Sequence, residues 1–226
     1  MKKISSLAAF FLVIGSSVAA PVISPVPNLM QEPQHATASK RIANYFTREH
    51  YVGLRIDDEL SAKVFDRYLK SLDFFRNVLL KSDVDSFEKY RNEFDNALAK
   101  SQFDFAYQMF NLSLTRRVER YDYAISLLDK PFDFTAKDSY EFEREDAPWA
   151  ADVAQLNELW RQKVKFDALN LKLAGKTAEE TTKLLKKRYE NAKKRLLQTE
   201  SEDVFQIVMN SYARSIEAHT SYLSPR

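Results

Sequence analysis

The chain contains no cysteine, and only three of its 226 residues are glycine. The lack of cysteine excludes disulfide bonds and thiolate chemistry, both nucleophilic and metal-binding. The scarcity of glycine argues against β-sandwiches and nucleotide-binding α/β folds, because both need glycine-rich turns. We therefore expect an all-α protein with one irregular multi-helix domain, whose core can draw on 16 phenylalanines and 11 tyrosines.

Hydrophobic runs long enough to span a membrane are also missing. The first apolar stretch, Ile4 to Ile14, follows a basic start and is shorter than the ~20 residues that a spanning helix needs. Small residues come next, up to Ala19, at the positions that a signal peptidase reads. We predict a secretory signal peptide over residues 1–19, cleaved after Ala19. A retained anchor is the less favoured alternative.

Positive and negative residues are nearly equal in number, and the predicted cleavage brings the net charge closer to zero. Removal of residues 1–19 takes away Lys2 and Lys3 and no acid, so the formal charge falls from +2 to 0. A neutral protein has no overall electrostatic attraction for nucleic acid or anionic membranes. We expect neither nucleic-acid binding nor strong membrane binding.

Behind the signal peptide, the chain divides into a leader and a helical region. Residues 20–36 are rich in proline and are expected to form an extended, mobile leader. Apolar side chains then recur at helical spacing through residues 37–226, which we interpret as one domain. The first helix is expected to begin near Thr37 and to end at Gly53. A helical period continues from Val84 to Leu98.

The second half of the helical region carries clearer boundary signals. The longest apolar stripe runs over residues 103–128, and an irregular, aromatic-rich crossover is expected over 131–150. Gly175 is placed to end the following helix. Thr177 and Glu180 form a capping box for the next one.

Residues that could carry catalysis or bind a metal are few. The three histidines, at 35, 50 and 219, form no H-E-x-x-H motif or i, i+4 pair, which argues against a zinc site. Ser86 and Lys89 fit S-x-x-K, but the companion S-D-N and K-T-G motifs are missing. We expect no catalytic, cofactor-binding or metal-binding residue, and no cofactor.

One strong run of positive charge occurs at residues 183–195. It could be a basic face that binds anionic membranes or an acidic partner. We favour a solvated helix face, because charge runs of this kind are common on helix surfaces.

Several blocks of sequence, in order along the chain, resemble a known family. They include L-S-A-K-V-F-D-R-Y-L at 60–69 and H-T-S-Y-L-S-P at 219–225, with others at 34–51, 79–87, 147–149, 159–167 and 201–205. The chain is similar to the N-terminal helical domain of the tail-specific proteases, also called carboxy-terminal processing peptidases, of Gram-negative bacteria. In that family a PDZ domain and a Ser–Lys protease core follow this domain.

The resemblance implies a non-catalytic scaffold or docking domain of a periplasmic serine endopeptidase. The sequence ends where the PDZ domain would begin, so we expect a truncated or split protein that is inactive alone. The expected partners are the protease core and PDZ region, in cis or in trans, and an envelope adaptor protein. The alternative is a stand-alone envelope interaction protein that binds an adaptor or competes with the full-length protease.

The last residues are the candidate functional residues that the resemblance supplies. His219, Thr220, Tyr222, Leu223 and Pro225 match the segment through which the family connects to its PDZ domain. The family has Asp-Pro just before this segment, whereas this chain has Glu-Ala at 217–218, a loss expected to make the junction less rigid. Without a neighbouring domain we expect exposed apolar surface here and self-association. A frayed terminus is the alternative.

Overall fold

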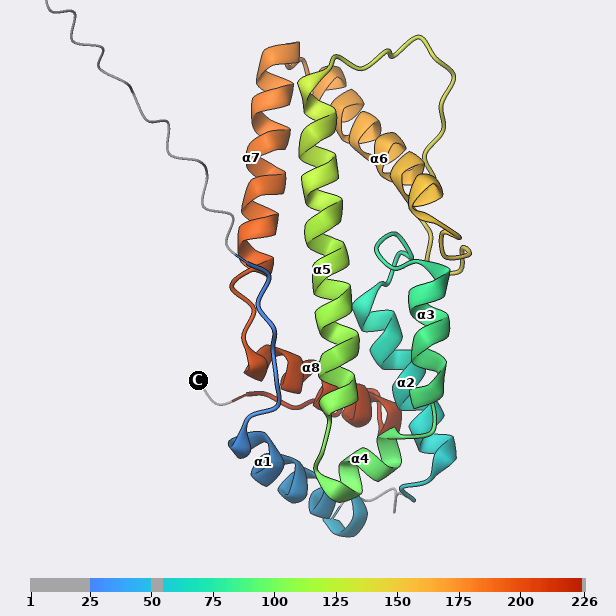
Figure 1. Ribbon diagram of the computed structural model, residues 1–226, viewed down its shortest axis with the longest axis vertical. Coiled ribbons are helices and arrows are strands. Elements are labelled where there is room, and N and C mark those ends of the chain that lie inside the picture. The colour runs from blue at the N-terminus through green and yellow to red at the C-terminus, as the bar shows by residue number, and fades with distance from the viewer. Residues whose placement is uncertain (1–24, 50–54, 225–226) are drawn as a thin grey trace, which may run out of the picture.

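The computed structural model describes residues 25–49 and 55–224, and these residues form an all-α domain, as expected (Figure 1). Within them there is no strand, and Leu80 and Ala150 form one isolated parallel bridge. The helices are α1 (Pro33–Asn44), α2 (Asp58–Leu72), α3 (Lys81–Phe87), α4 (Phe94–Lys100), α5 (Asp104–Ser126), α6 (Val153–Leu173), α7 (Ala178–Leu196) and α8 (Ser201–Ile216), with short turns η1 (Tyr45–Glu49), η2 (Glu88–Tyr90) and η3 (Leu127–Asp129).

Helix α5 is the long axis around which the other helices pack (Figure 1). Its first half contributes to an apolar cluster with α1, α2, α4 and α8, in which Phe65, Phe94 and Tyr212 are fully buried. Its last turns contribute to a second cluster with α6 and α7, built around Trp160 and Leu185. One continuous helix therefore joins two apolar cores.

The connection between α6 and α7 forms as the local sequence predicts. Gly175 adopts a positive φ of 81°. Its N–H donates to the Lys172 carbonyl and the Lys176 N–H donates to the Leu171 carbonyl, both at 3.0 Å, which closes α6 with a Schellman motif. The Thr177 hydroxyl accepts from the Glu180 N–H, completing the predicted capping box.

The start of the first helix differs from the prediction. Helix α1 begins at Pro33, four residues before Thr37, because proline is well suited to the first turn of a helix. Ahead of it, Leu29 is buried and exchanges two backbone hydrogen bonds with the Asn111 amide. Residues 25–32 thus form no helix, as expected for the leader, whereas the expectation is wrong for residues 33–36, which belong to α1. Gly53 lies outside the described residues.

The predicted helical run from Val84 to Leu98 is also interrupted. Helix α3 ends at Phe87, a 3-10 turn follows, and α4 begins at Phe94. The Ser61 hydroxyl of α2 accepts from the Phe94 N–H and donates to the Arg91 carbonyl, each at 2.8 Å. A tertiary contact thus supplies the hydrogen bonds that a continuous helix would have made internally.

The crossover at 131–150 is irregular, as predicted, and is fastened to α6. The Asp138 carboxylate accepts from Lys165 Nζ at 2.7 Å and from Arg161 at 3.1 Å. The Tyr140 ring packs at 5.5 Å from Phe166. The crossover therefore depends on ion pairs as well as apolar contacts.

Acid is expected to loosen this crossover. Hydrogen bonds from Lys165 and Arg161 hold the pKa of Asp138 below its ordinary value. The pair therefore contributes stability above the unfolded-state pKa, and this contribution is lost as pH falls through the lower folded-state pKa. Hydrogen exchange over 131–150, corrected for intrinsic rates, should accelerate between neutral pH and about pH 3.

The control for this experiment is a pair of amide variants. Asp138→Asn should exchange quickly already at neutral pH and show a reduced pH dependence. Glu143→Gln alters an exposed acid for which the described residues contain no ion pair, and should behave like the parent. If acid accelerated hydrogen exchange equally in the parent and in Asp138→Asn, the ion pairs of Asp138 would not be what fastens the crossover.

Candidate functional site at the C-terminal junction

The segment after α8 turns back along that helix. Thr220 donates to Glu217 through its N–H, at 3.2 Å to the carbonyl, and through its hydroxyl, at 3.0 Å to the carboxylate. The His219 N–H also bonds that carboxylate and lowers the pKa of Glu217. A carboxylate at 217 thus organises the turn that reverses the chain.

Asn210 and Tyr222 then fasten the returning segment to α8. The Tyr222 N–H donates to Asn210 Oδ1 at 2.9 Å, and Asn210 Nδ2 donates to the Tyr222 carbonyl at 3.0 Å. The Tyr222 ring meets the Phe205 ring edge to face, with centroids 5.5 Å apart. Burial, assisted by the charge of Glu202, raises the pKa of Tyr222 to about 12, so its hydroxyl is a neutral donor at physiological pH.

Beneath Tyr222 lies a polar network that joins three helices to residues 217–224, here called the junction segment. His35 of α1 is 1% exposed, and its Nε2 lies 2.8 Å from Glu202 of α8. The other Glu202 oxygen accepts from the Tyr222 hydroxyl at 3.2 Å. His35 Nδ1 accepts the Glu32 N–H at 3.1 Å, which assigns the ring proton to Nε2. Tyr107 of α5 contacts the same Nδ1 at 3.0 Å.

The candidate residues therefore have different environments. Tyr222 is anchored, Thr220 is half-buried, His219 is exposed, and Leu223 is 79% exposed. Pro225 and the predicted cleavage residue Ala19 lie outside the described residues.

Sequence reasoning missed His35, Glu202 and Asn210 as parts of this site. His35 and Glu202 are 167 residues apart, and neither belongs to a motif with a fixed spacing. A lone histidine on a helix carries no signal that names its partner. Only the packing of α1 against α8 brings the two together.

Other groups singled out from the sequence have structural environments. The Ser86 hydroxyl donates to the Asp83 carbonyl at 2.6 Å, and the Lys89 ammonium lies 4.8 Å from the Tyr90 ring centroid, so Ser86 and Lys89 do not form a nucleophile–base pair. Within residues 25–49 and 55–224, no three His, Asp or Glu side chains are grouped to hold a metal ion. No helix in this part of the chain is long and apolar enough to cross a bilayer.

The basic run at 183–195 lies on α7. Lys193 pairs with Asp122 at 2.5 Å, while Lys187, Arg188 and Lys194 are exposed. These three side chains therefore face solvent on α7.

Loss of the Asn210 amide should release the junction segment without unfolding the domain. In Asn210→Ala, two hydrogen bonds to Tyr222 disappear, at a cost of about 1–3 kcal/mol confined to this segment. Hydrogen exchange at residues 217–224 should accelerate, while α5 keeps its protection. Asn96→Ala, which removes an exposed amide on α4, is the matched control. Unchanged exchange at 217–224 would refute the role of Asn210 as a clamp.

Comparison with known proteins finds relatives of most of this chain. The family described as Tail specific protease N-terminal domain matches residues 42–226, which include α2 to α8 and the junction segment. The chain is 43% identical over 202 residues to the tail-specific protease of Haemophilus influenzae, a match that covers 89% of this chain. It spans only 29% of that relative's length. The chain thus belongs to the tail-specific protease N-terminal domain family.

Proposed function

We propose that this chain acts as the non-catalytic scaffold that precedes the substrate-binding and catalytic parts of a tail-specific serine endopeptidase. The observation that carries the proposal is the anchored junction segment. Tyr222 is held by Asn210 and Glu202, and the next residue, Leu223, extends an apolar side chain into solvent. This arrangement suits a connection that orients a following domain.

The energetics of this surface agree with domain docking. Burying a leucine side chain that is now 79% exposed contributes about 1.5–3 kcal/mol. A segment that is already ordered loses little conformational entropy when a partner packs against it. The junction therefore favours a fixed relative orientation over a loose tether.

We place the scaffold in the periplasm. This proposal rests on the signal peptide predicted for residues 1–19 and on the family relationship. An exported protein without cysteine must be stable without disulfides, and two apolar cores joined by α5 supply that stability.

A chimeric protease tests the scaffold role. Residues 25–226 of this chain, which include Leu29 and all of α1, replace the matched segment of the Haemophilus influenzae protease, and cleavage of an unstructured substrate with an apolar C-terminus is measured. The chimera should recover activity over a variant that lacks the segment. Leu223→Glu should lower that activity, whereas Leu173→Glu, at a similarly exposed leucine on α6, should not.

The outcomes separate the two functional hypotheses. A folded chimera that is no more active than the deletion variant would refute the scaffold proposal. If the isolated chain instead inhibits the intact relative when added in excess, the competing role as a stand-alone envelope interaction protein is favoured. Folding of the chimera is checked by its thermal unfolding transition.

A further inference from the structure

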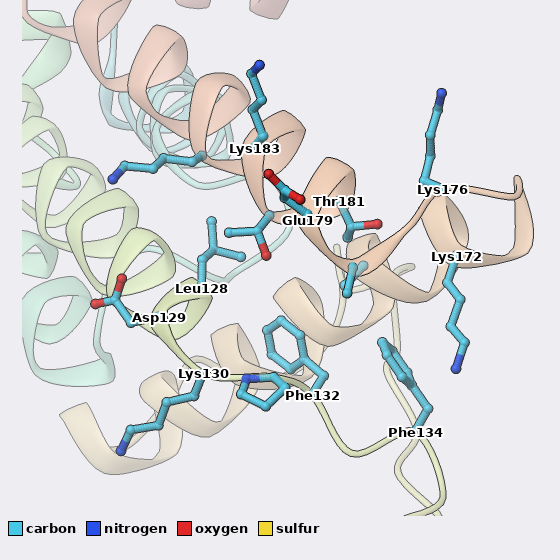
Figure 2. Close-up of a pocket in the computed structure, with 15 residues that line it drawn as sticks. Leu128, Asp129, Lys130, Phe132, Phe134, Lys172, Lys176, Glu179, Thr181 and Lys183 are labelled. Atoms are coloured by element: carbon cyan, nitrogen blue, oxygen red, sulfur yellow. The ribbon is translucent and has the colours of Figure 1, made fainter.

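A cavity of about 810 Å³ lies between the start of α7, the end of α6 and the segment that follows α5 (Figure 2). Such a volume is in the range of ~300–1,000 Å³ that small-molecule sites occupy. Its apolar wall comes from Leu128, Pro131, Phe132, Phe134 and Ala168. In Figure 2 the rings of Phe132 and Phe134 lie below α7, on the same side as Leu128.

Positive charge surrounds this apolar wall. Five lysines line the cavity against two acids, Asp129 and Glu179; the lysines are Lys130, Lys172, Lys176, Lys183 and Lys186. Lys130 and Lys183 extend away from the apolar groups (Figure 2), whereas the Lys172 ammonium lies 4.6 Å from the Phe134 ring centroid and Lys176 pairs with Glu180 at 3.8 Å. Among the described residues, no acid pairs with Lys130, Lys183 or Lys186. These three, here called the rim lysines, therefore have uncompensated charge that an anion could neutralise.

One buried polar group of the lining has no partner. Thr181 is 8% exposed, and its hydroxyl makes no hydrogen bond within the described part of the chain. A buried hydroxyl left unpaired costs about 1–3 kcal/mol. An unpaired buried polar group calls for an explanation, and a partner supplied by a bound ion or ligand is one.

We propose that this cavity binds a free single-chain anionic amphiphile, such as a long-chain carboxylate. The alkyl chain would cover Phe132 and Phe134, and the carboxylate would lie among the rim lysines and accept the Thr181 hydroxyl. A peptide fits less well, because its many backbone N–H and C=O groups would need partners. Thr181 is the one lining residue with an unpaired buried side-chain atom among those described. This site does not depend on the proposed scaffold role.

Calorimetric titration with laurate, kept below its micelle-forming concentration, tests the proposal. The expected result is saturable binding at one site per chain. Lauryl alcohol, which has the same alkyl chain without the charge, should bind at least about tenfold more weakly. No binding of laurate, or equal binding of the alcohol, would overturn the proposal. Binding only to anionic vesicles would likewise reject a free amphiphile in favour of a membrane surface.

Charge variants with matched net charge locate the site. The double variant Lys183→Met, Lys186→Met removes two rim lysines and should weaken laurate binding by about tenfold. The control, Lys187→Met with Lys194→Met, removes two α7 lysines that do not line the cavity and should bind within about twofold of the parent. Equal effects in both double variants would mean a non-specific basic surface and would refute the site.

Thr181→Val tests the hydroxyl separately from the fold. Valine has nearly the same shape and no polar atom. The free protein should therefore become equally or more stable, since an unpaired buried hydroxyl is removed. Laurate should bind about tenfold more weakly, because its carboxylate loses a donor. Unchanged affinity for laurate in a stable Thr181→Val protein would overturn the role of Thr181 in the site.

Discussion

Replacement of Phe94 by alanine is expected to lower the free energy of unfolding by about 3–5 kcal/mol. Phe94 is fully buried at the start of α4. Four aromatic rings surround it with centroids 4.9–6.4 Å away, those of Phe65, Tyr68, Phe105 and Tyr212. The substitution removes the apolar contacts and leaves a cavity where α2, α4, α5 and α8 meet. Such a loss is a large share of the ~5–15 kcal/mol typical of a domain.

Urea denaturation followed by far-UV circular dichroism measures this effect. Phe142→Ala is the matched control, because that ring is 60% exposed in the crossover and its loss should change stability by no more than about 0.5 kcal/mol. A loss below about 1 kcal/mol in Phe94→Ala would show that this cluster does not dominate the first core.

Replacement of Asp73 by alanine is expected to cost about 3 kcal/mol or more, although the residue carries a charge. Asp73 follows α2 and is 3% exposed. Its carboxylate accepts the N–H groups of Asn77, Val78 and Leu79 at 2.9–3.1 Å and the Trp149 indole at 3.2 Å. Removing it leaves several buried donors unpaired and detaches the end of the crossover from the turn.

A counter-charge is lost at the same time. Burial lowers the pKa of Arg117, while the negative charge of Asp73 acts in the opposite direction. Without Asp73, the desolvated guanidinium is less well compensated. Asp73→Asn should recover little stability, because its amide NH₂ would face donors that need an acceptor.

The control for Asp73 is an exposed ion pair. Asp85 contacts Lys81 at 2.6 Å across one helical turn, with the Asp85 side chain 57% exposed. Asp85→Ala should cost only about 0.3–0.5 kcal/mol. If the Asp73 and Asp85 variants unfolded at the same urea concentration, the proposed importance of the buried carboxylate would be wrong. Both are compared by urea denaturation at neutral pH.

The first described residues belong physically to the domain, although the family match begins at residue 42. Leu29 is buried, and its backbone is hydrogen-bonded to the side-chain amide of Asn111 on α5. His35 of α1 bonds Glu202 beneath the junction segment. The N-terminal segment and the C-terminal junction therefore share one polar network. A change in either is expected to affect the other through Glu202.

The helices and their boundaries were predictable where the determining contacts are local. Few glycines and a 3.6-residue apolar period predict an all-α fold. This prediction needs only local sequence, because the backbone hydrogen bonds of a helix join residues four apart. Gly175 and the Thr177–Glu180 capping box mark their helix ends by backbone and side-chain chemistry within a few residues.

Tertiary structure decided the features that depend on distant residues. Ser61 interrupts the helical period before Phe94 through a contact that no local pattern encodes. Packing of α1 against α8 brings His35 to Glu202, 167 residues away. The cavity at α7 likewise forms only where the start of α7, the end of α6 and the segment after α5 meet. Nothing in the local sequence around Thr181 distinguishes it from other helical residues. Amino-acid pattern determines which local structure forms, while burial and charge pairing between those structures determine where a site can exist.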